Sequence, residues 1–170
     1  MKYLVTITMV LMIGLLGCVK APKADDSVPV IDVEATETVG GEYVYEPGTW
    51  IDNWEKAIQT ATAEDKLILV NFTGSDWCGW CIRLAKEVFD HNEFKDYAKE
   101  NLVMLKLDFP RNIPQSSELI SQNRQLQEHF GIRGYPTILL VNGEGEEVAR
   151  TGYQQGGAAK YVEHLKDLVK

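Results

Sequence analysis

The chain has 170 residues, a formal net charge of −8 and three cysteines. This acidic balance argues against a nucleic-acid partner and against tight electrostatic binding to anionic lipid, because both surfaces are negatively charged. The length suits one folded domain that is preceded by an N-terminal extension.

The first 17 residues have the pattern of an export signal. One charge, Lys2, precedes an uncharged run over residues 3–16, which is shorter than the roughly 20 apolar residues of a membrane span. The run ends in "LLGC", which resembles a bacterial lipobox, so Cys18 is the expected lipidation site. An uncleaved membrane anchor is the alternative. Both interpretations place the domain in the cell envelope, facing the periplasm or the cell exterior.

Residues 18–47 are predicted to form the lipidated cysteine and a flexible tether. They show no apolar period and are rich in Pro, Gly, Asp, Glu and Thr. The stretch "GEYVYEP", 41–47, could instead lie on the domain as an edge strand. The folded domain is expected to span residues 48–170.

A helix is expected to begin after Asp52, because Asp52 and Glu55 have the spacing of a capping box. Its apolar face follows helical spacing and consists of Trp54, Ala57, Ile58 and Ala61. The nearly continuous apolar run "LILVNFT", 67–73, then predicts a strand that is buried on both faces.

The rest of the chain continues this alternation. The expected elements are a helix over 81–90 with apolar positions Ile82, Ala85 and Phe89, a helix over 93–100, strands over 102–109, 137–141 and 146–150, and a helix over 117–130. A turn at Asn142-Gly143 makes the last two strands a hairpin. A closing helix over 157–170 presents Tyr161, Val162, Leu165, Leu168 and Val169. This order predicts an α/β fold, with a central mixed β-sheet flanked by helices on both faces.

Two of the cysteines form a Cys-x-x-Cys motif in "SDWCGWC", residues 75–81. The motif follows a buried strand and opens a helix, which is the setting of a redox motif. Backbone N–H groups at a helix start favour an anion, so Cys78 is the expected nucleophile and Cys81 the resolving thiol. The exchange needs no cofactor. The three histidines are not spaced as metal ligands, so no metal is expected.

Two motifs together resemble the thioredoxin superfamily. "WCGWC" stands in place of that family's active-site motif, and "GIRGYPT", 131–137, resembles the segment that carries a cis-proline facing it. The resemblance runs from about residue 50 to 170 and implies a thioredoxin-like fold. "FTGSDWCGWC" followed by "LDFP" most resembles the thioredoxin-like domains of exported disulfide reductases.

The resemblance implies a substrate-binding role for four more residues. Pro136 takes the place of the cis-proline, which leaves the backbone of Tyr135 free to pair with an extended substrate segment. Trp77 matches the family tryptophan beside the sulfurs. Trp80 takes a place often held by proline, and simple packing is the alternative for it.

Two departures from the family pattern bear on the chemistry. Asn71 stands where thioredoxins usually keep a buried aspartate, and an amide cannot take a proton from Cys81. That step could fall to Asp76, to water or to no dedicated group; otherwise Asp76 is a solvated loop carboxylate. The second departure is length: "TGSDW" and residues 110–121 are both longer than in a minimal thioredoxin.

These features predict a monomeric, membrane-tethered thiol–disulfide oxidoreductase. The reductase direction rests on the resemblance, because sequence alone does not reveal a reduction potential. It implies a membrane electron donor and, as substrates, disulfide-containing exported proteins, including apocytochromes. A disulfide oxidase or isomerase and a non-catalytic client-binding module remain the alternatives.

Overall fold

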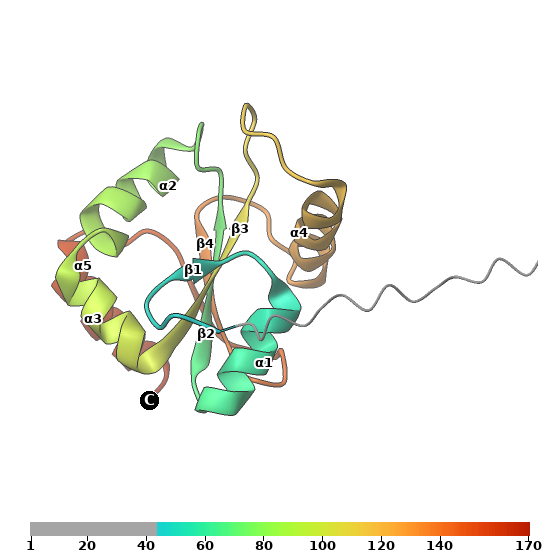
Figure 1. The fold of residues 1–170 in the computed structure, drawn as a ribbon. Helices are drawn as coiled ribbons and strands as arrows, with labels where there is room; N and C mark the ends of the chain where they lie inside the picture. The colour runs from blue at the N-terminus through green and yellow to red at the C-terminus, as the bar shows by residue number, and fades with distance from the viewer. Residues whose placement is uncertain (1–43) are drawn as a thin grey trace, which may run out of the picture. The chain divides into compact units, whose positions relative to one another are not determined.

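The computed structural model describes residues 44–170 (Figure 1). The expected export signal over 1–17, the lipidation site Cys18 and most of the 18–47 tether lie outside the described residues. Within residues 44–170, none of the helices has the length and apolar character that crossing a membrane requires.

A five-stranded mixed sheet forms the centre of the domain, in the order β1-β3-β2-β4-β5. The strands are β1 (Trp50–Ile51), β2 (Leu67–Thr73), β3 (Leu102–Asp108), β4 (Thr137–Val141) and β5 (Glu147–Thr151). The first three are mutually parallel, whereas β4 runs antiparallel to both β2 and β5. The central strand β2 therefore ends in the middle of one sheet edge, where the cysteine motif begins.

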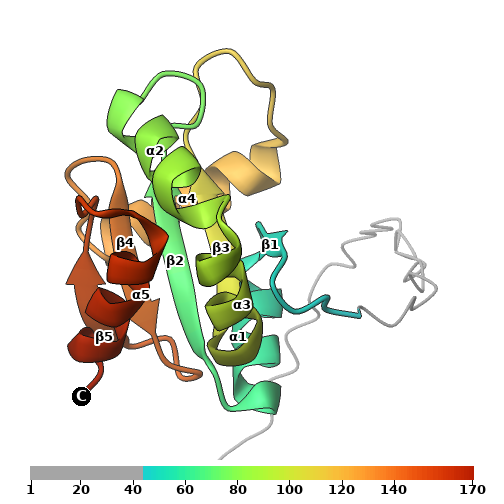
Figure 2. The same ribbon diagram turned by 90° about the vertical axis from the view of Figure 1, so that its left-hand side faces the viewer.

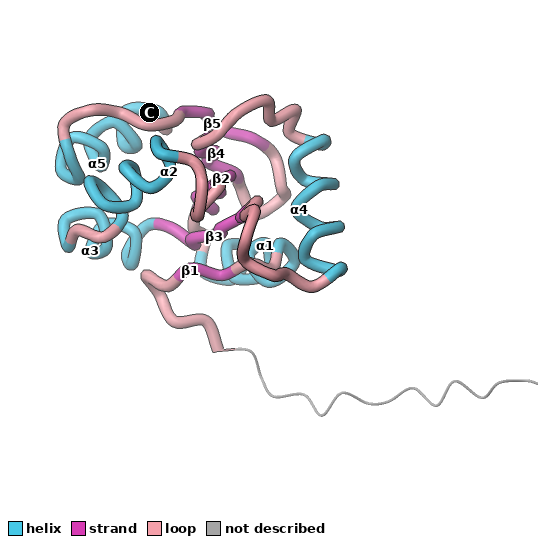
Figure 3. Tube along the Cα trace, turned by 90° about the horizontal axis from the view of Figure 1, so that it is seen from above, coloured by secondary structure: helices cyan, strands magenta, loops and turns pink. Residues whose placement is uncertain are grey.

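Helices cover both faces of the sheet (Figures 1 and 3). One face carries α2 (Gly79–Leu84), α3 (Asn92–Asn101) and α5 (Gly157–Leu168), and Figure 2 looks onto this side. The other carries α1 (Trp54–Glu64) and α4 (Ser117–His129). The fold is thioredoxin-like, as the sequence predicts, and the expected order of elements is confirmed from α1 onward, whereas β1 was not expected.

The two faces of β2 belong to two separate parts of the core. Leu69 packs with Leu84 and Tyr161, beneath the helices of the α2 face. Its neighbours Ile68 and Val70 point the other way and pack with residues that include Leu126, Phe130 and Ala57. Because successive side chains of a strand alternate between faces, a nearly continuous apolar run is what this strand requires.

The expected capping box of α1 was wrong by one residue. Asn53 is the N-cap, and its side-chain oxygen accepts the backbone N–H of Lys56 at 2.9 Å. Gln122 of α4 accepts the N–H of Trp54 at 2.9 Å and donates to the Asp52 carbonyl at 2.7 Å. The side chain of Gln122, which is distant in the sequence, thus holds the start of α1. A local sequence pattern does not reveal this contact.

The helix that follows the cysteines changes pitch partway along. A π-helical turn, η1 (Ala85–Phe89), continues α2, and the Asp90 N–H donates to the Ala85 carbonyl at 2.9 Å. The wider turn buries Val88 and Phe89 side by side. Ile82, expected on the apolar face, is 37% exposed, so that assignment was wrong.

The two ends of the described domain concern the alternative edge strand over 41–47, of which 41–43 lie outside the described residues, and the expected closing helix. Residues 44–47 form no strand; the edge strand is β1, which pairs with β3, and Tyr45 packs against the core on the α1 side. At the other end, α5 stops at Leu168. Val169 lies beyond the helix and is 41% exposed, so its place on the apolar face was also wrong.

Candidate redox site

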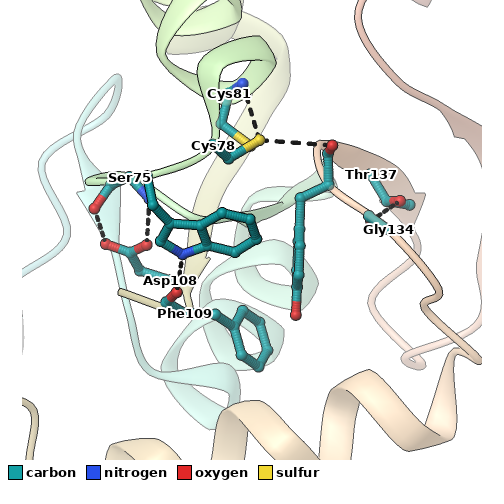
Figure 4. The surroundings of a disulfide bond; sticks show 9 residues. Ser75, Cys78, Cys81, Asp108, Phe109, Gly134 and Thr137 are labelled. Atoms are coloured by element: carbon teal, nitrogen blue, oxygen red, sulfur yellow. Dashed lines mark hydrogen bonds between the residues drawn. A yellow bond between two sulfur atoms is a disulfide. The ribbon is translucent and has the colours of Figure 1, made fainter. Parts of the chain in front are cut away.

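The two cysteines lie where β2 leads into α2 (Figure 4). Cys78 is the N-cap residue of α2, and its sulfur accepts the backbone N–H of Cys81 at an N···S distance of 3.3 Å. The two sulfurs are joined in a disulfide, with Cα atoms 5.2 Å apart. Because a backbone donor at a helix start prefers an anion, the same contact would stabilise a Cys78 thiolate after reduction.

The loop before β4 faces the disulfide. The peptide bond between Tyr135 and Pro136 is cis, as the resemblance implies. The carbonyl oxygen of Tyr135 lies 3.6 Å from the Cys78 sulfur. The Tyr135 hydroxyl accepts the Gln127 amide at 2.6 Å, which fixes its ring. Backbone atoms of this loop are therefore held against the Cys78 sulfur.

Trp77 is held from several directions. Its indole N–H donates to the Phe109 carbonyl at 2.7 Å, and the Arg111 guanidinium lies over its ring at 4.3 Å from the centroid. The Tyr135 ring meets it edge-on at 5.8 Å. Gly74 lies directly against the indole, because a Cβ at that position would come within 2.5 Å of the ring. Trp77 is therefore a fixed part of the site.

Trp80 sits on a more open side of the site and is 56% exposed. Its ring contacts Tyr153 at 5.2 Å and the Arg83 guanidinium at 5.6 Å. Arg83 pairs with Glu87 at 2.7 Å, and the Tyr153 hydroxyl donates to the same carboxylate at 2.5 Å. The Tyr153 hydrogen bond, and then Arg83, hold the pKa of Glu87 below its ordinary value. Sequence analysis missed Tyr153, which lies in a loop with no motif.

Asp76 supports the loop that follows β3. Its carboxylate accepts the Arg111 N–H at 2.9 and 3.1 Å and the Asn112 N–H at 2.7 Å. The Arg111 backbone hydrogen bond is the main cause that lowers the pKa of Asp76. A carboxylate stabilised in its charged form is a weak base, so the geometry favours a bracing role over proton transfer to or from Cys81.

A second carboxylate, Asp108, joins the same two loops and was not expected from the sequence. It ends β3, is 8% exposed, and accepts the Ser75 N–H at 2.9 Å and the Ser75 hydroxyl at 2.5 Å (Figure 4). The next residue, Phe109, donates its N–H to the Thr73 carbonyl at 2.8 Å. The only signal for this role is an acidic residue at the end of a buried strand, in "LDFP".

Asn71 is 6% exposed, and its side-chain oxygen has no hydrogen-bond partner among residues 44–170. Strand alternation places it on the same side of β2 as Leu69, which packs with Leu84 of α2. An amide at this buried position offers no exchangeable acidic proton to the cysteines.

The histidines make local contacts away from the cysteine motif. The His129 ring packs against Phe130 at a centroid distance of 4.6 Å, and His164 Nε2 lies 2.8 Å from the Thr151 hydroxyl. Across residues 44–170, no three His, Cys, Asp or Glu side chains gather as a potential metal site.

Comparison with known proteins agrees with this geometry. The thioredoxin-like domain model matches residues 54–168. The chain is 34% identical over 119 residues to the disulfide bond reductase DsbH of Chlamydia pneumoniae, covering 70% of this chain and 72% of that protein. It is 30% identical over 122 residues to the thiol:disulfide interchange protein DsbD of Pseudoalteromonas atlantica, covering 70% of this chain but 19% of DsbD.

A solved structure of a DsbH oxidoreductase superposes with a TM-score of 0.68 at 30% sequence identity, covering 76% of this chain and 93% of that one. Fold, motif and sequence similarity thus agree over the domain that contains both cysteines. The chain belongs to the thioredoxin-like family and is a thiol–disulfide oxidoreductase of the DsbH and DsbD type, with Cys78 and Cys81 as its cysteine pair.

Proposed function

We propose that this chain is a membrane-tethered reductase of disulfides in exported proteins. The reductase direction is supported by the similarity to DsbH, which is described as a disulfide bond reductase. The tether is supported by the uncharged N-terminal run and by Cys18 in the lipobox pattern. The chemistry rests on one observation: the Cys78 sulfur accepts the Cys81 N–H at the start of α2 and lies beside the Tyr135 carbonyl.

The reaction begins with the reduced dithiol form. The Cys78 thiolate attacks one sulfur of the partner's disulfide, forms a mixed disulfide and releases the other partner sulfur as a thiolate. The Cys81 thiolate then attacks the Cys78 sulfur and releases the second partner sulfur. The partner gains two electrons and, with two protons from solvent, two thiols, while the enzyme becomes the Cys78–Cys81 disulfide. A membrane dithiol donor must return two electrons for each turnover.

The partner's reacting segment is proposed to lie along the Tyr135 backbone. The Tyr135 carbonyl oxygen, which lies 3.6 Å from the Cys78 sulfur, supports a backbone-paired, extended substrate. Trp77 and Trp80 flank that path on either side of the cysteines and would contact side chains of the partner.

The roles of the two cysteines are tested by single substitutions in the purified domain. Cys78→Ser should abolish insulin reduction, because it removes the nucleophile. Cys81→Ser should still attack but should stall as a mixed disulfide, which accumulates with partners and disappears under reductant. Equal trapping by both variants would contradict the assignment. A client-binding module without turnover would bind partners equally well with both cysteines replaced.

The direction of transfer is tested by the reduction potential of the Cys78–Cys81 pair. A value near about −270 mV would support a reductase, and one near about −120 mV would show a strong oxidant. Equilibration with glutathione or dithiothreitol buffers, followed by tryptophan fluorescence, measures it.

The anchor is tested by Cys18→Ser in the full chain. The variant should leave the membrane fraction or accumulate as an unprocessed precursor, while its disulfide chemistry in the purified domain is unchanged. Wild-type fractionation and processing would show that the lipobox interpretation is wrong.

A further inference from the structure

We propose that Arg111 selects partners that carry an acidic side chain close to the disulfide to be reduced. This inference rests on the proposed reductase function and adds a substrate class to it. Arg111 belongs to the segment 109–112, called here the rim loop, which follows β3 and lies against Trp77. Its guanidinium is the only charged group that stacks on that ring within the described residues.

The stacking leaves the hydrogen-bonding edge of the guanidinium available. The guanidinium carbon lies over the Trp77 ring, at 4.3 Å from the centroid. The N–H groups of a guanidinium point outward in its own plane, in a geometry that matches a carboxylate. No salt bridge within residues 44–170 involves Arg111, which is an exposed residue. Its charge is therefore presented to a partner without a carboxylate of this domain bound to it.

The position of this charge is fixed by the backbone of the rim loop. Asp76 accepts the backbone N–H groups of Arg111 and Asn112, while the Phe109 carbonyl accepts the Trp77 indole N–H. The Asp108 carboxylate ties Ser75 to the end of β3. Asp76 thus holds the backbone of Arg111 rather than its guanidinium. Because the backbone of this residue is already fixed, less conformational entropy is lost when a partner binds the guanidinium.

Arg111 also lies beside the path that a reacting segment would take. The Trp77 ring contacts Arg111 on one side and the Tyr135 ring on another, and the Tyr135 carbonyl lies 3.6 Å from the Cys78 sulfur. A segment paired with the Tyr135 backbone therefore passes the rim loop within a few residues of its target cysteine. An acidic side chain there would meet the guanidinium.

A second arginine provides a natural comparison within the site. Arg83 lies over the Trp80 ring at 5.6 Å, but its charge is paired with Glu87 at 2.7 Å. The two arginines thus stack on the two tryptophans beside the sulfurs, and one of them is neutralised. With a net charge of −8, the chain as a whole repels acidic partners, so any preference for them must come from a local cation.

The test uses the full-length protein in its reduced form and three peptides, each with one internal disulfide. The peptides differ only in a residue beside the target cysteine, which is Glu, Gln or Lys. Second-order rate constants come from single-turnover mixing. The wild type should reduce the Glu peptide about threefold to fivefold faster than the Gln peptide, and the Lys peptide most slowly. High salt should shrink this preference.

Variants assign the preference to one side chain. Arg111→Gln should lose it, Arg111→Lys should keep part of it, and Arg111→Glu should reduce the Lys peptide faster than the Glu peptide. The matched control Arg83→Gln makes the same substitution on the other tryptophan and should retain the preference for Glu. The rate with uncharged 2-hydroxyethyl disulfide measures thiol–disulfide exchange in the absence of charge recognition.

Three results would overturn the inference. Equal rates of the wild type with all three peptides would show that no charge is selected. An equal loss in Arg83→Gln and Arg111→Gln would assign the preference to net charge. A uniform slowing of Arg111→Gln on every substrate, including 2-hydroxyethyl disulfide, would mean that Arg111 only positions Trp77. If the reduced wild type attacks none of these disulfides, the proposed reductase function fails together with this inference, which is a distinguishable outcome.

Discussion

Trp77 and Trp80 flank the same pair of sulfurs, but the protein holds them in different ways. Trp77 donates a hydrogen bond to a backbone carbonyl of the rim loop, lies against Gly74 and is 36% exposed. Trp80 is 56% exposed, and within residues 44–170 its side chain has ring contacts with Tyr153 and Arg83. Each tryptophan precedes one of the two cysteines in the sequence, but of their two side chains only that of Trp77 is hydrogen-bonded to the backbone among residues 44–170.

The difference separates two tasks of the site. The Trp77 side is joined by hydrogen bonds between the link 74–77 and the end of β3, so it sets the position of the cysteine loop. The Trp80 side is held by a surface ion pair, Arg83 with Glu87, and such pairs contribute little to stability. Apart from the exposed Arg111 guanidinium, we expect substitutions on the first side to change stability and rate together, and substitutions on the second to change stability little.

The largest difference is expected between two glycine substitutions in the same loop. Gly74→Ala places a Cβ 2.5 Å from the Trp77 ring and must displace the indole, at a cost of about 1–3 kcal/mol. Gly79→Ala meets no atom within 4 Å at the first residue of α2, so it should be neutral or stabilise by up to about 1 kcal/mol. Urea unfolding and insulin reduction measure both effects. Equal stabilities would show that Trp77 moves aside without cost.

A smaller difference is expected when each tryptophan is replaced by phenylalanine. Trp77→Phe removes the hydrogen bond to the Phe109 carbonyl, which should cost about 1 kcal/mol of unfolding free energy. Trp80→Phe removes exposed ring area and should stay within about 0.5 kcal/mol of the wild type. Denaturant midpoints at fixed slope give both values. A larger loss for Trp80→Phe would reverse the comparison.

The smallest effect concerns the carboxylate on each side and its dependence on pH. Hydrogen bonding lowers the pKa of Asp76, chiefly from the Arg111 backbone, and that of Glu87, chiefly from the Tyr153 hydroxyl. Because each folded pKa lies below the ordinary value, each carboxylate stabilises the fold above that value and loses this effect as pH falls through the lowered pKa.

The variants Asp76→Asn and Glu87→Gln test this linkage. Each should be slightly less stable than the wild type at neutral pH, and the difference should vanish in acid, where the wild-type carboxyl is also protonated. Only Asp76→Asn should change the Trp77 fluorescence of the dithiol form, because Asp76 holds the backbone of Arg111, which lies over the Trp77 ring. Unfolding midpoints at several pH values measure the linkage. A difference that persists unchanged at low pH would show that ionisation is not its cause.

The sequence predicted the parts of this molecule that depend on short-range pattern. The apolar run 67–73, the turn at Asn142-Gly143 and the cysteine motif each carry their signal within a few residues, and each occurs as expected. The start of α1 depends instead on Gln122, which is 70 residues from Asp52 in the chain. No local pattern contains that contact.

The rest of the site was missed for the same reason. Asp108 and Ser75 are 33 residues apart, and Tyr153 and Glu87 are 66 apart, so each pair meets only after the sheet has formed. The π-helical turn after α2 also shifted the buried face away from Ile82, because helical spacing assumes a constant pitch. Asp76 was recognised as a candidate, but its partners in the rim loop were not.

The hydrogen bond from the Cys81 N–H to the Cys78 sulfur also joins folding to electron transfer. In a thermodynamic cycle, the reduction potential of the pair depends on how much folding stabilises the dithiol form relative to the disulfide form. A thiolate accepts this N–H more strongly than a disulfide sulfur does, so the contact favours the folded dithiol. For a two-electron couple, about 1.4 kcal/mol corresponds to about 30 mV. The difference between the unfolding free energies of the two forms would therefore report, without any redox buffer, how far folding shifts the reduction potential of this pair.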